Sequence, residues 1–298
     1  MRGQVPGRVA IGFVALGVLL AGCGSGGGTD GGSPTAAPNT SATTAATSAP
    51  TTATTTVAES PSPFGTRPSL PLDPRNKGSK VVSSPSPDGL MMSGREYGSG
   101  PHGVVLAPSG NVRYTQFDWL ATAAKLAKVG YHVLTFNVRG ICYTPDPNVG
   151  CSEGDIDWAN AWQDVAGAVE FLRSHGARVV SVMGADLGGT MALYANAQGT
   201  KMDGIVTVSG LEDSEGYVIG PPVLDKTDAP KLFVAGKDDD EALQAYTDWM
   251  REAPPPKRGL LLPTETRGTF IFDPIAPSEY ALGKRALNEV EALLQSIG

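Results

Sequence analysis

The chain has 298 residues and a formal net charge of −7 at pH 7, with 23 Lys and Arg against 30 Asp and Glu. This acidic balance argues against the basic surfaces by which proteins bind nucleic acid or an anionic membrane surface, so we expect no nucleic acid as a partner. Its length suffices for one sizeable hydrophobic core.

Residues 1–22 are typical of a secretory signal peptide. Arg2 and Arg8 supply the positive charge, and the apolar run at 9–22, VAIGFVALGVLLAG, is too short to span a membrane comfortably as a helix. The run ends in Leu-Ala-Gly directly before Cys23, which resembles the bacterial lipobox, where the Cys is lipidated and becomes the mature N-terminus. An ordinary signal peptide followed by an incidental Cys is the alternative. We expect an exported protein, lipid-anchored through Cys23 to the extracytoplasmic face of the cell membrane.

Residues 23–78 form a linker rich in Gly, Ser, Thr, Ala and Pro. Its first aromatic residue is Phe64, and such a composition cannot offset the entropy of ordering by burying apolar surface. We expect a disordered, lipid-anchored tether, followed by a single domain over residues 79–298.

The domain alternates short apolar runs with helical patterns. Six short apolar runs predict strands, at 102–109, 131–137, 179–184, 204–209, 231–236 and 259–263. Helical patterns lie at 116–129, 157–174, directly after residue 186, at 239–252 and at 278–296. Continuous apolar strands alternating with helices predict an α/β fold, with a mostly parallel sheet covered by helices on both faces.

Two cysteines lie in an irregular loop between the second predicted strand and the next helix. Cys142 and Cys151 are separated by eight residues that include Pro145 and Pro147. In an exported domain, two cysteines so close together favour a disulfide over a metal site. We predict that they form a disulfide that closes this loop.

The stretch VVSVMGADLGGTM, residues 179–191, has the pattern of a sharp turn from a strand into a helix. A β-branched run meets Gly184, a short bend and Gly188, as in the nucleophile elbow G-x-S-x-G. The residue at the tip is Asp186 instead of Ser.

In this element order, residues 100–298 resemble the α/β-hydrolase superfamily, in particular its small, lidless dienelactone-hydrolase-like and esterase-like members. The resemblance rests on five pieces in the right order: VVLAPSG, LTFNVRG with CSEGD, GADLGG, LFVAGKDDD and LLLPTETRGTF. It implies an α/β-hydrolase-type sheet. Because only about twenty residues separate the strands at 204–209 and 231–236, we expect no cap domain.

The resemblance places the three catalytic positions of the superfamily at Asp186 for the nucleophile, Asp238 for the acid and Arg267 for the base, with Asp239 as an alternative acid. The oxyanion-hole positions are Leu187 with Ser109 or Gly110. An Arg guanidinium stays protonated at physiological pH, so it cannot act as a general base. The catalytic triad is therefore degenerate.

None of the three histidines is placed to supply the missing base of the triad. His102 and His132 lie at the starts of predicted strands and His175 at the end of a helix, whereas functional groups gather beyond the carboxyl ends of the strands. Ser109 and Ser209 lie at strand ends and not on an elbow, which favours a role in satisfying backbone groups.

Asp186 can still be considered as a nucleophile. Haloalkane dehalogenases and epoxide hydrolases of the superfamily use an elbow Asp that forms an ester with the substrate. That ester must be cleaved by a water that a His activates, and no suitably placed His exists here. Those enzymes also carry a helical cap.

The acidic run from Asp238 to Glu241 suggests either a Ca²⁺ site or a helix start, since carboxylates also cap helices and favour their dipole. The helix start is the interpretation we favour. We expect no metal and no cofactor.

The sequence therefore predicts a non-catalytic, membrane-tethered protein with a binding or cell-envelope role, whose partner is an unknown small molecule or envelope protein. The alternative is a hydrolase of ester, lactone, alkyl-halide or epoxide bonds with Asp186 as nucleophile. We expect an ionic network of Asp186, Arg267 and Asp238 in place of the triad, or at least one direct contact within it.

Overall fold

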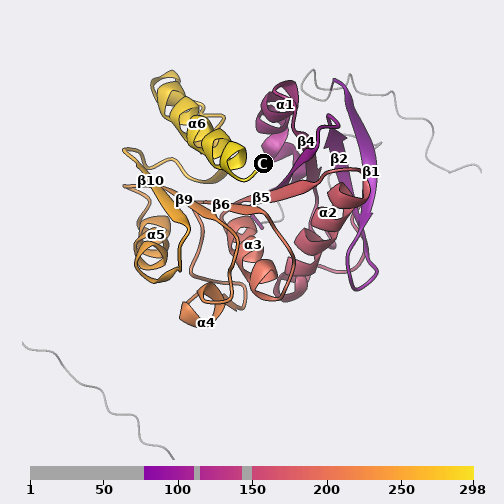
Figure 1. Cartoon of the computed structure of the whole chain (residues 1–298), viewed down its shortest axis with the longest axis horizontal. Helices are drawn as coiled ribbons and strands as arrows, with labels where there is room; N and C mark the ends of the chain where they lie inside the picture. The colour runs from indigo at the N-terminus through magenta and orange to yellow at the C-terminus, as the bar shows by residue number, and fades with distance from the viewer. Residues whose placement is uncertain (1–76, 111–114, 143–149) are drawn as a thin grey trace, which may run out of the picture. The chain divides into compact units, whose positions relative to one another are not determined.

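The computed structural model describes residues 77–110, 115–142 and 150–298. The predicted signal peptide, Cys23 and the linker up to residue 76 lie outside these residues. An eight-stranded sheet runs in the order β1-β2-β4-β3-β5-β6-β9-β10, with helices on both faces (Figure 1). The predicted α/β fold is confirmed.

Six parallel strands form the centre and one edge of the sheet, and they match the predicted apolar runs. They are β3 (His102–Ala107), β4 (His132–Phe136), β5 (Val179–Ala185), β6 (Gly204–Val208), β9 (Lys231–Gly236) and β10 (Lys257–Leu262). Every residue of β4, β6 and β9 is buried, as expected for strands covered on both faces.

The opposite edge carries two antiparallel strands that the sequence patterns did not predict, β1 (Ser79–Pro85) and β2 (Met91–Tyr97). β1 pairs only on one side and is largely solvent-accessible. Its sequence, SKVVSSP, therefore lacks a continuous apolar run.

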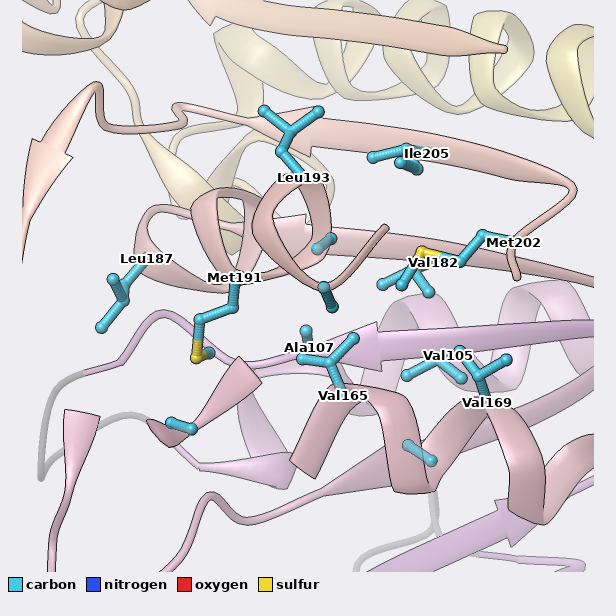
Figure 2. Packing of buried hydrophobic residues seen from close by; sticks show 14 of the residues in the cluster. Val105, Ala107, Val165, Val169, Val182, Leu187, Met191, Leu193, Met202 and Ile205 are labelled. Carbon is cyan, nitrogen blue, oxygen red and sulfur yellow. The ribbon is translucent and has the colours of Figure 1, made fainter. Parts of the chain in front are cut away.

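Helices cover the sheet in two layers. α1 (Leu120–Lys128), which follows a 3₁₀ turn at Gln116–Trp119, and α6 (Tyr280–Ser296) lie on one face. The other face carries α2 (Trp162–Ser174), α3 (Leu187–Ala197), α4 (Pro221–Leu224) and α5 (Asp240–Glu252). In Figure 2, Val169 of α2 lies beside Val105 of β3, while Val165 of α2 and Met191 of α3 lie near Ala107 at the end of the same strand. This core holds the start of α3, and with it Asp186, in place.

The segment between β6 and β9 is short. It holds the hairpin of β7 (Asp213–Ser214) and β8 (Tyr217–Val218) and the four-residue α4. The Tyr217 ring is buried, and its hydroxyl donates to the carbonyl of Trp158 at 2.6 Å. This segment lies where a cap domain would be inserted, and it is too short to form one.

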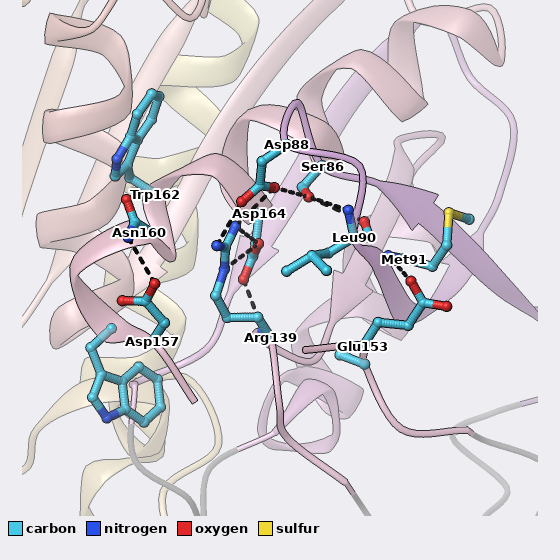
Figure 3. A network of polar contacts seen from close by, with 12 residues as sticks. Ser86, Asp88, Leu90, Met91, Arg139, Glu153, Asp157, Asn160, Trp162 and Asp164 are labelled. Atoms are coloured by element: carbon cyan, nitrogen blue, oxygen red, sulfur yellow. Dashed lines mark hydrogen bonds and ion pairs between the residues drawn. The ribbon is translucent and has the colours of Figure 1, made fainter. Parts of the chain in front are cut away.

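A buried ionic network fastens the turn after β4. Arg139 donates to Asp164 of α2 at 2.7 Å and to Asp88 of the β1–β2 turn at 2.8 Å (Figure 3). The backbone N–H of Arg139 also donates to Asp164, at 2.8 Å. Three segments distant in sequence are thus joined through one guanidinium.

The loop that follows is closed by the predicted disulfide, Cys142–Cys151, with an S–S distance of 2.00 Å. Directly after it, the hydroxyl of Ser152 accepts from the N–H of Ser93 on β2 at 2.9 Å. The disulfide is confirmed, and it lies beside contacts that bind this loop to the antiparallel edge of the sheet. Among the described residues, no helix is long and apolar enough to cross a membrane.

Candidate functional site

Asp186 sits at the tip of the predicted elbow, between β5 and α3, with φ 46° and ψ −120°. A non-Gly residue in this region of φ/ψ space is strained and persists only where the surrounding structure fixes it. Here the surrounding backbone packs so closely against the turn that no side chain fits at two flanking glycines. A Cβ on Gly184 would lie 2.2 Å from the carbonyl carbon of Gly188, and one on Gly188 would lie 2.4 Å from the carbonyl oxygen of Pro108. The elbow geometry is retained although Ser is absent.

The Asp186 carboxylate is paired with Arg267. Nε and Nη2 of Arg267 both lie 3.0 Å from Oδ1 of Asp186. Burial raises the pKa of Asp186 above its ordinary value, while the Arg267 charge and a hydrogen bond from the Ser109 hydroxyl act in the opposite direction. Oδ1 of Asp186 is therefore already bound by the Arg267 guanidinium.

Arg267 lies among three carboxylates. Besides Asp186, its Nη1 is 3.3 Å from Oε2 of Glu241 and its Nε is 3.7 Å from Oδ2 of Asp239. Burial disfavours the guanidinium charge, but the Asp186 and Asp239 carboxylates outweigh it and raise the pKa of Arg267. The residue in the base position therefore stays protonated.

The expected participation of Asp238 is wrong. Its side chain is 52% exposed and pairs with Lys237 at 3.1 Å. The alternative, Asp239, is turned inward instead, because β9 ends at Gly236 and α5 begins at Asp240. Asp239 is the N-cap of α5, where its Oδ1 accepts the N–H of Ala242 at 3.4 Å.

The loop that presents Arg267 is anchored at both ends. The N–H of Gly268 donates to the buried Ser209 hydroxyl at 2.9 Å. On the other side, the hydroxyls of Thr264 and Thr266 donate to Oε1 of Glu279 at 2.5 and 2.6 Å. Ser209 thus has a structural role, and Arg267 approaches Asp186 from a fixed loop.

A cavity of about 300 Å³ opens above Asp186. Its lining includes the three residues predicted for an oxyanion hole, Ser109, Gly110 and Leu187, together with Arg267. In the first turn of α3, the N–H of Gly189 donates to the carbonyl of Asp186 at 3.1 Å. The donors that this end of the helix can offer the cavity are therefore the N–H groups of Leu187 and Gly188. The space therefore fits a small polar ligand.

Other lining residues had no signal in the sequence. The β7–β8 segment contributes Leu211, Ser214 and Glu215, and the loop after Arg267 contributes Phe270. Neither segment contains a catalytic motif, and each reaches the cavity only because of the tertiary fold. Glu241, which pairs with Arg267, was predicted as part of a helix start, with a Ca²⁺ site as the alternative, and not as a contact of Arg267.

The three histidines lie elsewhere. His132 pairs with Glu96 at 2.7 Å, His175 follows α2 and stacks on Phe171 with ring centroids 4.0 Å apart, and His102 lies 6.3 Å from the Tyr131 ring. None of them lines the Asp186 cavity. Within the part of the chain that the structure describes, no group of three His, Cys, Asp or Glu side chains is arranged to hold a metal ion.

No protein-family model and no curated protein matches this chain. Solved structures do resemble it. The Pyrococcus furiosus esterase Pf2001 aligns with a TM-score of 0.57 at 16% identity, covering 78% of this chain and 97% of the esterase.

The α/β hydrolase GrgF from Penicillium sp. sh18 aligns with a TM-score of 0.58 at 15% identity, covering 74% of this chain and 98% of GrgF. The dienelactone hydrolase from Anabaena variabilis aligns with a TM-score of 0.53 at 18% identity, covering 70% and 94%. Together with the sheet order and the elbow, these likenesses show that the domain has the α/β-hydrolase fold.

Proposed function

We propose that this protein is an exported, lipid-anchored binding protein whose α/β-hydrolase-fold domain holds a small ligand in the Asp186 cavity without turning it over. The observation that carries the proposal is the ion pair between Asp186 and Arg267, at 3.0 Å, in the two positions where the fold usually has a nucleophile and its base.

Hydrolysis requires a group that accepts a proton at the right place and time. The guanidinium of Arg267 cannot do this, because Asp186, Asp239 and Glu241 stabilise its charged form. A carboxylate on the elbow also opposes the second negative charge that an acyl-transfer oxyanion would place beside it. Ligand binding needs neither step.

The cellular location in this proposal rests on the sequence of the first 78 residues. A lipid on Cys23 would anchor the chain, and the Gly/Ser/Thr/Pro-rich tether would let the domain reach ligands or envelope proteins away from the membrane. Replacing Cys23 with Ala should release the protein from the membrane fraction, and mass spectrometry of the wild-type N-terminus should detect the lipid.

A second candidate is a hydrolase that uses Asp186 as nucleophile. The strained elbow and the cavity above it favour this possibility. It requires a base that cleaves the resulting ester, and no His lies in the cavity lining. Turnover of an ester, lactone, epoxide or haloalkane that is lost in Asp186→Ala would establish it.

The binding proposal is tested by screening small molecules for an increase in melting temperature, since a ligand that binds only the folded state stabilises it. Ser214→Trp should abolish the increase by filling the cavity. Val218→Trp is the matched control, because Val218 is 63% exposed on the same hairpin and does not line the cavity. Turnover of hits by the wild-type protein, or equal responses of the two variants, would contradict the proposal.

A further inference from the structure

We propose that residues 68–74 of this chain, PSLPLDP, dock as a polyproline II helix in an apolar groove between α1 and α6. We call these residues the proline segment; they lie outside the described residues. The inference concerns how the domain is held on its tether, and it does not depend on what binds in the Asp186 cavity. It rests on the groove, on the spacing of the prolines and on the place where the described chain begins.

The groove is a cavity of about 350 Å³ on the face of the sheet that α1 and α6 cover. α1 forms one wall, the first turns of α6 form the other, and the loop before α6 completes the lining. The ring of Tyr280 is 58% exposed there. The lining is mostly apolar and aromatic, and it consists of Lys125, Phe272, Asp273, Pro274, Tyr280, Gly283, Lys284 and Leu287.

The proline segment has the spacing that such a groove binds. Pro68, Pro71 and Pro74 recur at every third residue, and no other prolines between residues 23 and 76 do so. A polyproline II helix has three residues per turn, so these three rings line one edge of it. Its conformation is formed before binding, and aromatic-lined grooves bind segments of this kind for that reason. Leu70 and Leu72 add apolar surface.

The described chain begins close to the groove. Ser79 of β1 pairs with Tyr97 of β2, and a Cβ on the next residue, Gly98, would lie 3.6 Å from Cβ of Ala127 on α1. The chain therefore enters the domain about one strand spacing from the α1 wall. The two residues between Pro74 and the described chain can span about 10 Å, and the proline segment itself covers about 20 Å. No long connection is needed.

The charges are compatible with docking. Lys125 and Lys284 stand on the two walls of the groove, and Asp73 is the one carboxylate of the proline segment. Asp273 lines the groove as well, and Arg75 directly follows the segment. Each sign of charge on the segment therefore has its opposite in the groove.

Docking would connect the tether to the candidate site. The loop that carries Arg267 continues to the groove: Phe270 lines the Asp186 cavity, while Phe272 and Pro274 line the groove. A docked segment packs on this loop. It also shortens the free part of the tether to residues 23–67 and fixes the side of the domain from which the tether leaves.

The test is oxidative cross-linking in the full chain, purified in nonionic detergent. Cys142 and Cys151 are joined to each other, so replacing Cys23 with Ser leaves an introduced pair as the free thiols. We expect Leu70→Cys/Lys284→Cys to form its intramolecular disulfide at least ten times faster than Leu70→Cys/Glu170→Cys. Mass mapping of peptides without reduction measures both rates.

Glu170 is the matched control position because a free segment would reach it as well. It is exposed on α2, on the other face of the sheet, and α2 packs directly against β1: a Cβ on Gly167 would lie 2.2 Å from the carbonyl oxygen of Pro85.

A second pair of variants tests the polyproline II conformation. Replacing Pro68, Pro71 and Pro74 with Ala should slow the 70–284 cross-link to the rate of the 70–170 pair. The same change at Pro34, Pro38 and Pro50, which lie earlier in the linker, should leave that rate unchanged.

Three results would overturn the proposal. Equal rates for the 284 and 170 pairs would show that the segment does not dock in the groove. A cross-link that joins two molecules instead of two positions of one molecule would assign the groove to a second copy of the chain. Equal rates for the two proline variants would rule out recognition through the proline spacing.

Discussion

Two arginine–aspartate pairs in this domain use the same chemistry in different surroundings. In the network after β4, Arg139 is 3% exposed and Asp164 fully buried, and the guanidinium is shared with Asp88. At the elbow, Arg267 is 42% exposed and its partner Asp186 is 15% exposed, beside a cavity. The first pair is closed to ligands and holds the fold. The second is accessible and lines the cavity above the elbow.

The closed pair should give the largest effect on stability. Arg139→Ala leaves the Asp164 carboxylate buried without its cation, which destabilises a domain by about 3–5 kcal/mol. Lys237→Ala is the control, because Lys237 and Asp238 are 51% and 52% exposed and such a pair contributes about 0–1 kcal/mol. Urea unfolding followed by circular dichroism measures both, and equal losses would remove the distinction between closed and open pairs.

The Cys142–Cys151 disulfide stabilises the loop that follows the Arg139 network, and it does so by a covalent bond instead of an ion pair. Replacing Cys142 and Cys151 with Ala opens a loop with a sequence separation of 9 residues. In the chain-entropy model this costs about 2–3 kcal/mol. The midpoint of urea unfolding should fall in the double variant and in the reduced wild-type protein alike. A variant as stable as the oxidised protein would show that the loop constrains little.

The open pair should matter less to stability than its contacts suggest. Arg267→Ala leaves Asp186 and Asp239 facing each other, but water reaches a side chain that is 42% exposed. We expect a loss of about 1–2 kcal/mol, between the values for surface and buried pairs. Unfolding measured beside Arg139→Ala gives the ranking. A larger loss for Arg267→Ala would mean that the elbow pair, too, is mainly structural.

The pH dependence of stability sharpens the comparison further. Burial raises the pKa of Asp186, so the folded protein keeps this proton to a higher pH than the unfolded chain, in which an Asp titrates near about 4. The free energy of unfolding therefore falls as pH rises from about 4 through the native pKa of Asp186. Asp186→Asn should reduce this fall. Urea unfolding at several pH values tests it, and unchanged slopes would contradict the raised pKa.

The sequence was most informative where burial imposes a pattern. The continuous apolar runs predicted β3, β4, β6 and β9, since strands covered on both faces must be apolar throughout. The sequence pattern did not predict β1, because only one of its edges pairs and its side chains are largely exposed. The glycines around Asp186 predicted the elbow, because no side chain fits at those close approaches.

The site itself was predictable only in part. The order of motifs placed Asp186 and Arg267 near each other, and the structure brings them to 3.0 Å. The choice between Asp238 and Asp239 depends on where α5 begins, a boundary that shifts by one residue without changing the pattern. Tertiary folding alone brings Glu241 to Arg267 and the β7–β8 segment to the cavity.

The central claim is that Asp186 carries out no covalent chemistry, and the mass of the tryptic peptide that contains this residue tests it most directly. If Asp186 attacked an alkyl halide or an epoxide, we expect the resulting ester to persist, because no histidine lines the cavity to activate the water that would cleave it. After prolonged incubation with 1-bromobutane or styrene oxide, we expect a tryptic peptide containing residue 186 of unmodified mass, identical to that of an untreated sample. An adduct located on Asp186, and missing from Asp186→Asn, would contradict the account.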